Sequence, residues 1–136
     1  MLSIVLWHVS AFEINGPANE VTITDSELRD SDIGLYVSNS AENIAVFKTV
    51  IENMEKYGMD IYSTSNIERI ELKSLSVCGT TDSADISFYK IGTVIDNIDV
   101  AGDLICDYAM EYNYDGNGNN RNITSEYCTA SCPLTI

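Results

Sequence analysis

An apolar pattern that repeats along the chain places the strongest limit on its fold. One unit holds an apolar pair, a single apolar residue and a second pair, as in Ile44-x-Val46, Ile51 and Met59-x-Ile61. The equivalent positions in the units before and after are Val21, Ile23, Leu28, Leu35 and Val37, then Ile70, Leu72, Val77, Ile86 and Phe88. A fourth unit begins with Ile98, Val100 and Ile105, and Ile123 would open a fifth. Successive first positions are 23, 26, 28 and 25 residues apart, a period typical of stacked repeats.

Within a unit, the x-separated pairs indicate strands rather than helices. Alternate side chains of a strand face the same side, so each pair places two residues inward and one outward. One coil of three short strands cannot bury its apolar face alone, whereas stacked coils join these faces into a continuous core. At the turns, Gly34 and Gly58 precede the strands of Leu35 and Met59, where we expect a positive φ. The pattern therefore predicts an all-β solenoid.

Charged residues and cysteines provide a check on this alignment. With the units aligned, Asp25 lies against Lys48 and Arg29 against Glu52. Opposite charges on neighbouring strands are mildly favourable. Further along the second of these columns lie Cys78 and then Cys106, each directly after an inward residue. The alignment therefore predicts that the two cysteines are neighbours on consecutive coils.

The repeat resembles one known superfamily. The stretches Asn43-Ile-Ala-Val, Ile51-Glu-Asn53 and Tyr57-Gly-Met-Asp-Ile-Tyr-Ser63 are similar to the repeat of right-handed parallel β-helix proteins of the pectin-lyase-like superfamily. The resemblance covers residues 12–112. It implies an all-β, right-handed, single-stranded parallel β-helix of about five coils. That superfamily includes polysaccharide lyases, hydrolases, phage tailspikes, adhesins and structural surface proteins, so the resemblance implies a fold and not one function.

The ends of the chain suggest that the solenoid continues. Phe12-x-Ile14 matches the closing pair of an earlier coil, and Ile123 opens a coil that stops near Pro133. Solenoids normally cap their ends, because bare ends expose core and unpaired strand edges. We therefore expect residues 1–136 to form a single domain that is a fragment of a longer solenoid. Its partners would be flanking coils of the same protein, or a second copy in end-to-end association.

Composition narrows the classes of partner. The chain has 136 residues, is 45% hydrophobic and carries a formal net charge of −14, with only seven Lys and Arg. Phosphate binding needs clustered basic side chains, so nucleic acid is not expected as a partner. The apolar opening run, residues 1–12, is too short to span a bilayer, and it lacks the basic start of a signal peptide, which leaves only a trimmed or atypical one as an alternative. No membrane insertion is expected.

Four cysteines and one sequon indicate an extracellular or cell-surface location. An even number of cysteines favours disulfides in an oxidising compartment over free buried thiols. Metal binding is less favoured, because the spacing is wrong for zinc and the single histidine is His8. Neighbouring strands place Cα atoms about 4.8 Å apart, within disulfide reach. This predicts a Cys78–Cys106 pair and leaves Cys128 and Cys132 for each other. In the sequon Asn122-Ile-Thr124, Asn122 is a candidate glycosylation site.

The loop from Asp115 to Glu126 is a candidate calcium site. Four oxygen-bearing side chains occupy places 1, 3, 5 and 12 of an EF-hand-like loop: Asp115, Asn117, Asn119 and Glu126. Two departures weaken the match, because the sixth place holds Asn120 rather than Gly and the expected apolar residue comes one place late, at Ile123. The alternative is an Asn/Gly-rich turn without metal. Ca²⁺ is thus the one cofactor to consider.

Enzymatic signatures are weak. A nucleophilic triad would have to use His8, which lies in the apolar opening run. The 21 acidic residues make a glycosidase-like pair of carboxylates easy to find and hence uninformative. The eight tyrosines, including Tyr108, Tyr112 and Tyr114 near the loop, could form a sugar-stacking strip. The leading hypothesis is a structural or adhesive segment of a surface protein; the residues favour a non-enzymatic role but leave open a polysaccharide lyase or glycoside hydrolase. The alternatives are a carbohydrate-active enzyme or carbohydrate-binding module whose catalytic coils lie elsewhere, and a calcium-stabilised assembly unit.

Overall fold

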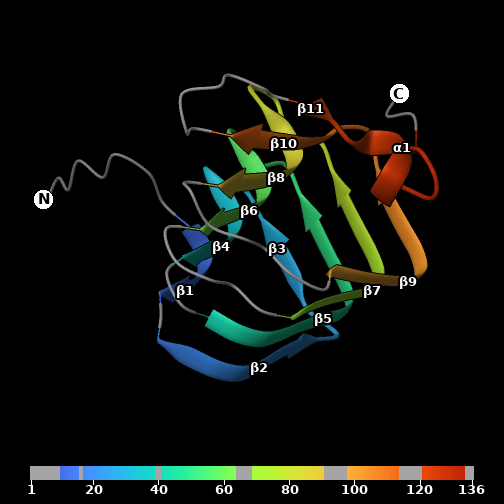
Figure 1. The fold of residues 1–136 in the computed structure, drawn as a ribbon. Helices are drawn as coiled ribbons and strands as arrows, with labels where there is room; N and C mark the ends of the chain where they lie inside the picture. Colours follow the sequence, from blue (N-terminus) through green and yellow to red (C-terminus); the bar gives the residue numbers. More distant parts are fainter. Residues whose placement is uncertain are drawn as a thin grey trace, which may run out of the picture.

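The computed structural model shows an all-β chain wound into a solenoid of about four turns (Figure 1). It describes residues 10–15, 17–38, 41–63, 69–90, 98–113 and 121–133. The strands are β1 (Ser10–Asn15), β2 (Ala18–Thr24), β3 (Glu27–Arg29), β4 (Ile33–Ser38), β5 (Ala41–Glu52), β6 (Tyr57–Ser63), β7 (Ile70–Cys78), β8 (Ala84–Lys90), β9 (Ile98–Cys106), β10 (Ala109–Asn113) and β11 (Arg121–Asn122). One helical turn, α1 (Thr124–Tyr127), follows β11.

The strands form two sheets that run along the solenoid. The first has the order β1-β4-β6-β8-β10-β11, and the second has the order β2-β5-β7-β9, with β3 also paired to β5. Each pair joins a strand to its equivalent one coil away and is parallel, except for the antiparallel pair β10–β11. The stacking of parallel coils predicted from the repeat is confirmed. The right-handed sense of the coil stays a prediction from the resemblance.

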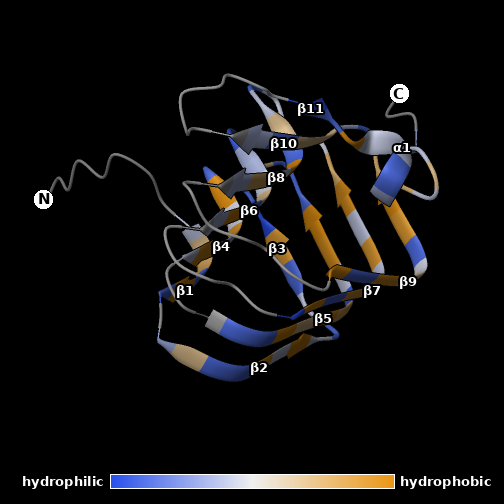
Figure 2. Ribbon diagram, viewed as in Figure 1, coloured by the Kyte–Doolittle hydropathy of each residue, from blue (hydrophilic) through white to orange (hydrophobic). Residues whose placement is uncertain are grey.

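The inward columns of the first three units match the sequence alignment. Paired residues in successive coils are Val21, Ile44, Ile70 and Ile98; Ile23, Val46, Leu72 and Val100; Leu28, Ile51 and Val77; Leu35, Met59 and Ile86; and Val37, Ile61 and Phe88. In the middle coils these side chains are at most 1% exposed. Apolar and polar residues alternate along the strands (Figure 2), as expected when one face of a strand lies in the core.

Left-handed residues mark the corners of the coil. Positive φ values recur in three columns: Glu20 and Asn43; Asp25, Lys48, Ser74 and Gly102; and Asp30, Asn53 and Gly79. Most are not glycine, although a left-handed conformation costs an ordinary residue roughly 1–2 kcal/mol. The second column bends β5, β7 and β9, so that each of these strands covers two legs of its coil. In the first coil the same corner separates β2 from β3.

Gly34 and Gly58 have a different role from the one that the sequence predicts. Neither has a positive φ. A Cβ atom on Gly34 would lie 2.4 Å from the carbonyl oxygen of Gly58, and one on Gly58 would lie 2.2 Å from Cγ1 of Val77. Distances this short are not tolerated between non-bonded atoms. The prediction of a positive φ is wrong: these glycines allow adjacent coils and core side chains to approach closely.

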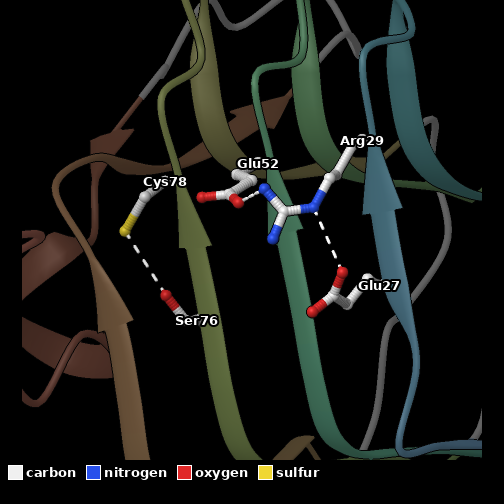
Figure 3. A network of polar contacts seen from close by, with 5 residues as sticks. All are labelled: Glu27, Arg29, Glu52, Ser76 and Cys78. Carbon is white, nitrogen blue, oxygen red and sulfur yellow. Dashed lines mark hydrogen bonds and ion pairs between the residues drawn. The ribbon is translucent and has the colours of Figure 1, made fainter.

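The outer face of the second sheet confirms one predicted charge pair. Arg29 on β3 pairs in register with Glu52 on β5, which in turn pairs with Cys78 on β7. The guanidinium of Arg29 forms ion pairs with Glu52 and with Glu27 (Figure 3). Because these side chains are partly exposed, the pairs mainly fix the alignment and add little to stability.

The predicted register fails between the third and fourth coils. Lys73 pairs with Ala101, but Leu75 pairs with Leu104, so β9 contains one residue more than β7 at this corner. An inserted residue moves every later side chain to the opposite face of the strand. Leu104 and Cys106 are therefore inward and 1% exposed, whereas Ile105, predicted to be inward, is only half-buried.

Residues 121–133, which we call the cap, lie where the sequence predicts a fifth coil. After β10 the chain reverses into β11, and Ile123 follows it with 1% exposure. The Tyr127 ring on α1 lies 5.3 Å from the Phe88 ring, and Ala130 forms a parallel bridge with Ile105. The prediction that Ile123 opens another parallel coil is wrong.

Candidate functional site

Tyrosines from four consecutive coils lie on the outer face of the first sheet. We call Tyr36, Tyr62, Tyr89 and Tyr112 the tyrosine strip; they come from β4, β6, β8 and β10. Tyr62 pairs in register with Tyr89, and Tyr89 pairs with Tyr112. Tyr36 pairs instead with Asp60, so its ring reaches the strip from the adjacent outward column.

The rings of the strip contact one another. The centroids of Tyr62 and Tyr89 are 4.5 Å apart with 8° between the ring planes, and those of Tyr89 and Tyr112 are 4.9 Å apart at 11°. The rings of Tyr36 and Tyr62 are 6.3 Å apart and tilted by 34°. Because the faces of the stacked rings pack against one another, a ligand would contact mainly ring edges and phenolic groups along the strip. Stacked aromatic pairs also add roughly 0.5–1.5 kcal/mol each to stability.

A buried carboxyl group lies beside the strip. Asp60 is 8% exposed and occupies an outward position on β6, between Tyr36 on β4 and Ser87 on β8. Ser87 hydrogen-bonds its carboxyl group, but Oδ1 has no hydrogen-bond partner among the residues that the structure describes. Burial raises the pKa of Asp60 from its ordinary value of 3.8 to about 7, and the bond from Ser87 partly opposes this. A polar atom that is buried without a partner is costly and is often found at functional sites.

The phenol of Tyr36 is also perturbed. Burial, followed by the negative charges of Asp60, Tyr62 and Glu13, raises the pKa of Tyr36 to about 12. At neutral pH Tyr36 keeps its proton, as tyrosines ordinarily do, and the raised pKa extends this to alkaline pH, so the phenol remains a hydrogen-bond donor. The strip thus combines aromatic edges, a protonated phenol and an acid that can change its charge near neutral pH.

The tyrosines chosen from sequence agree only in part with this strip. Tyr112 belongs to it, but Tyr108 is 38% exposed and lies outside it, and Tyr114 lies outside the described residues. The sequence does carry a signal for the strip. Tyr62 and Tyr89 each follow the last inward residue of their coil directly, at equivalent places in the repeat.

The four cysteines form two disulfides that fasten the cap to the solenoid. Cys78 on β7 bonds to Cys132, and Cys106 on β9 bonds to Cys128. The predicted pairs Cys78–Cys106 and Cys128–Cys132 are wrong. The extra residue in β9 turns Cys106 inward, while Cys78 faces outward, so the two cannot meet on the same face. Disulfides weakly favour an oxidising, extracellular setting.

Two carboxylates hold the cap through backbone bonds. Asp85 is 4% exposed, and its Oδ2 accepts hydrogen bonds from the N–H groups of Asp107 and Tyr108 at 2.8 and 3.2 Å. Asp107 in turn accepts a bond from the N–H of Cys132 at 2.9 Å. The two carboxylates and the Cys132 sulfur lie close enough to suggest a metal site. However, the sulfur is held in a disulfide and is not a thiolate, so we interpret the cluster as structural.

The predicted calcium loop is only partly described. Asp115, Asn117 and Asn119 lie outside the described residues. Glu126 is exposed and lies 3.2 Å from the guanidinium of Arg121, which also bonds to Glu111 at 2.8 Å. A calcium ion at this loop would therefore have to compete with Arg121 for the carboxylate of Glu126. Calcium binding stays a prediction.

An acidic corner lies where β3 is connected to β4 and at the equivalent place in the next coil. Asp30, Asp32 and Glu55 line an open depression of about 470 Å³. A hydrogen bond to the carboxyl of Asp32, followed by the charges of Asp32 and Asp82, raises the pKa of Glu55. Carboxylates stacked on successive coils repel one another, and this corner shows no further feature that points to a ligand.

Comparison of the chain with protein-family models, with curated proteins and with solved structures gives no match. In the part of the chain that the structure describes, no helix has the length and the apolar content needed to cross a bilayer. The site therefore has to be interpreted from its own geometry.

Proposed function

We propose that this chain is a structural, adhesive segment of an extracellular or cell-surface protein, built as a right-handed β-helix of the pectin-lyase-like type. Contact with its ligand is made through the tyrosine strip. The observation that carries the proposal is the alignment of Tyr36, Tyr62, Tyr89 and Tyr112 on one outer face, with the buried Asp60 beside them. Tyrosine is favoured at contact surfaces because one large, rigid side chain offers both apolar area and a polar tip.

The rigidity of the strip supports an adhesive role. Its side chains are held by neighbouring rings and by strands that pair coil to coil, so little conformational entropy is lost on binding. A repeat at the spacing of the strands also suits an extended ligand that offers hydrogen-bonding groups at intervals. A polysaccharide chain is such a ligand, and we therefore take carbohydrate as the first class to test.

The test is binding of the disulfide-bonded chain to a glycan array and to immobilised polysaccharides. Tyr62→Ala removes the ring that touches both Tyr36 and Tyr89, and we expect at least a tenfold loss of affinity. Tyr108→Ala is the matched control, because Tyr108 is an exposed tyrosine outside the strip. Thermal melting of both variants shows whether the fold is kept. Equal binding by wild type and the folded Tyr62→Ala variant would contradict the proposal, as would a wild type that binds none of the glycans.

A further inference from the structure

The edge of the cap presents Asn122 to solvent. Asn122 lies on β11, opposite Met110 of β10, and its side chain is exposed. The next residue, Ile123, is 1% exposed and packs in the core. Burial of Ile123 therefore anchors the chain directly after β11, while Arg121 and Asn122 of this strand are both exposed. The chain has no other Asn-x-Ser/Thr sequence, so this exposed position coincides with the one sequon available.

The hydrogen bonds of the sequon hold the amide oxygen of Asn122 against Thr124 and leave its amide nitrogen, the atom that a glycan would modify, outside these bonds. The Thr124 N–H donates to Oδ1 of Asn122 at 2.9 Å, and the Thr124 hydroxyl donates to the same oxygen at 2.6 Å. A backbone N–H can only donate, so the atom that faces it must be the amide oxygen. The amide nitrogen Nδ2 consequently points away from Thr124.

Thr124 itself is fixed, which makes this arrangement a stable one. The N–H of Ala109 on β10 donates to the Thr124 hydroxyl oxygen at 3.0 Å. The same residue begins α1, whose following segment is tied down by the Cys106–Cys128 disulfide. The sequon is thus held in one conformation at the surface. Beside it lies an open depression of about 550 Å³, lined by small polar residues of the cap that include Thr124, Ser125 and Ser131.

We propose that Asn122 is an N-glycosylation site and that its glycan lies over the cap. In the transfer, Nδ2 of Asn122 forms a bond to C1 of the first sugar of a lipid-linked oligosaccharide diphosphate, supplied with its transferase by the secretory pathway. The bond between C1 and the diphosphate oxygen breaks, the lipid diphosphate leaves, and a base of the transferase takes the proton lost from Nδ2. The disulfides fit this setting, because both reactions occur in an oxidising compartment.

The test is translation of the full chain, behind a secretory leader, in the presence of endoplasmic-reticulum microsomes. We expect the translocated, protease-protected chain to gain one glycan, seen as a mobility shift that peptide N-glycosidase removes while converting Asn122 to aspartate. Asn122→Gln should abolish the shift, and Thr124→Ser should keep it, because the hydroxyl is retained. Asn19→Gln is the matched control at an exposed asparagine outside the sequon. A protease-protected wild-type chain without a glycan would overturn the proposal, and so would a shift that persists in Asn122→Gln.

Discussion

The first three coils and the C-terminal region follow different rules. Between β2 and β8, each coil repeats the last one, and every inward column continues in register. From β9 onward, one inserted residue changes the register, the chain reverses direction, and two disulfides join segments that the repeat does not relate. The comparison shows that equivalent residues in neighbouring coils stabilise the regular part, whereas the region from β9 onward is held by contacts that the repeat does not supply.

The largest effect is expected from a charge in the regular part. Ile61→Asp would place an unpaired carboxylate at a position that is 0% exposed, between Val37 and Phe88 in its column. Burial of such a charge costs several kcal/mol, a large part of the stability of a typical domain. We expect the variant to be unfolded by circular dichroism. Ala101→Asp is the control, since it adds the same charge at an exposed position opposite Lys73; comparable unfolding in both would contradict the inward assignment.

A second pair of substitutions tests the register change in β9. Leu104→Asp should destabilise the protein by about 3–5 kcal/mol, because Leu104 is inward and 1% exposed. Ile105→Asp, one residue later, should cost much less, because its side chain lies on the outer face. Urea denaturation of the two variants measures the difference. A larger destabilisation by Ile105→Asp than by Leu104→Asp would contradict the register change and support the uninterrupted repeat that the sequence predicts.

The disulfides should contribute slightly less. They close loops with sequence separations of 54 and 22 residues, and the loop-entropy relation gives about 4 kcal/mol for Cys78–Cys132 and about 3 kcal/mol for Cys106–Cys128. We expect the double variant Cys78→Ala/Cys132→Ala to lose more stability than Cys106→Ala/Cys128→Ala. Peptide mapping without reduction checks the connectivity first. Recovery of a Cys78–Cys106 peptide would show that the cap is not fastened as described.

The most gradual effect concerns pH. Asp60 has a pKa of about 7 in the folded protein against 3.8 ordinarily, so between these values the folded state holds a proton that the unfolded state has lost. Its contribution to stability is complete below pH 3.8 and is lost as the pH rises through about 7. The slope is at most about 1.4 kcal/mol per pH unit. Denaturation at several pH values should show a shallower fall with rising pH in Asp60→Asn. Parallel curves of unfolding free energy against pH for wild type and variant would contradict the burial of a protonated Asp60.

The sequence predicts the fold where periodicity is the cause of the structure. The columns through Ile44, Val46 and Ile61 follow from spacing alone, because each inward place must be filled by an apolar residue in every coil. Spacing does not reveal where an extra residue is absorbed. In β9 the extra residue is accommodated at the left-handed corner formed by Gly102, next to Ser74. Because Ile105 is also apolar, the sequence alignment wrongly assigns it to the inward position that follows.

The cap and the strip were difficult to predict for a related reason. The cap depends on contacts between segments of different periodicity, such as Tyr127 with Phe88 and Thr129 with Leu104, which no pattern within the repeat specifies. The tyrosine strip depends on outward positions, and these tolerate many residues. Burial of Asp60 depends on its neighbours in adjacent coils, so a single acid in an otherwise ordinary strand gives no warning of its environment.

The Cys78–Cys132 bond has a mechanical consequence. A pulling force applied at the C-terminus would pass from Cys132 directly into the third coil at Cys78, because the bond bypasses the intervening chain. The segment between them, with a sequence separation of 54 and a length of roughly 180 Å when extended, is shielded from tension while the bond is intact. The load then acts on β7, which ends at Cys78, and passes to β5 through the hydrogen bonds between these coils. Reduction of this bond would release the part of that length outside the Cys106–Cys128 loop, and reduction of both bonds would release all of it, so the extensibility of the protein is set by the redox state of its surroundings.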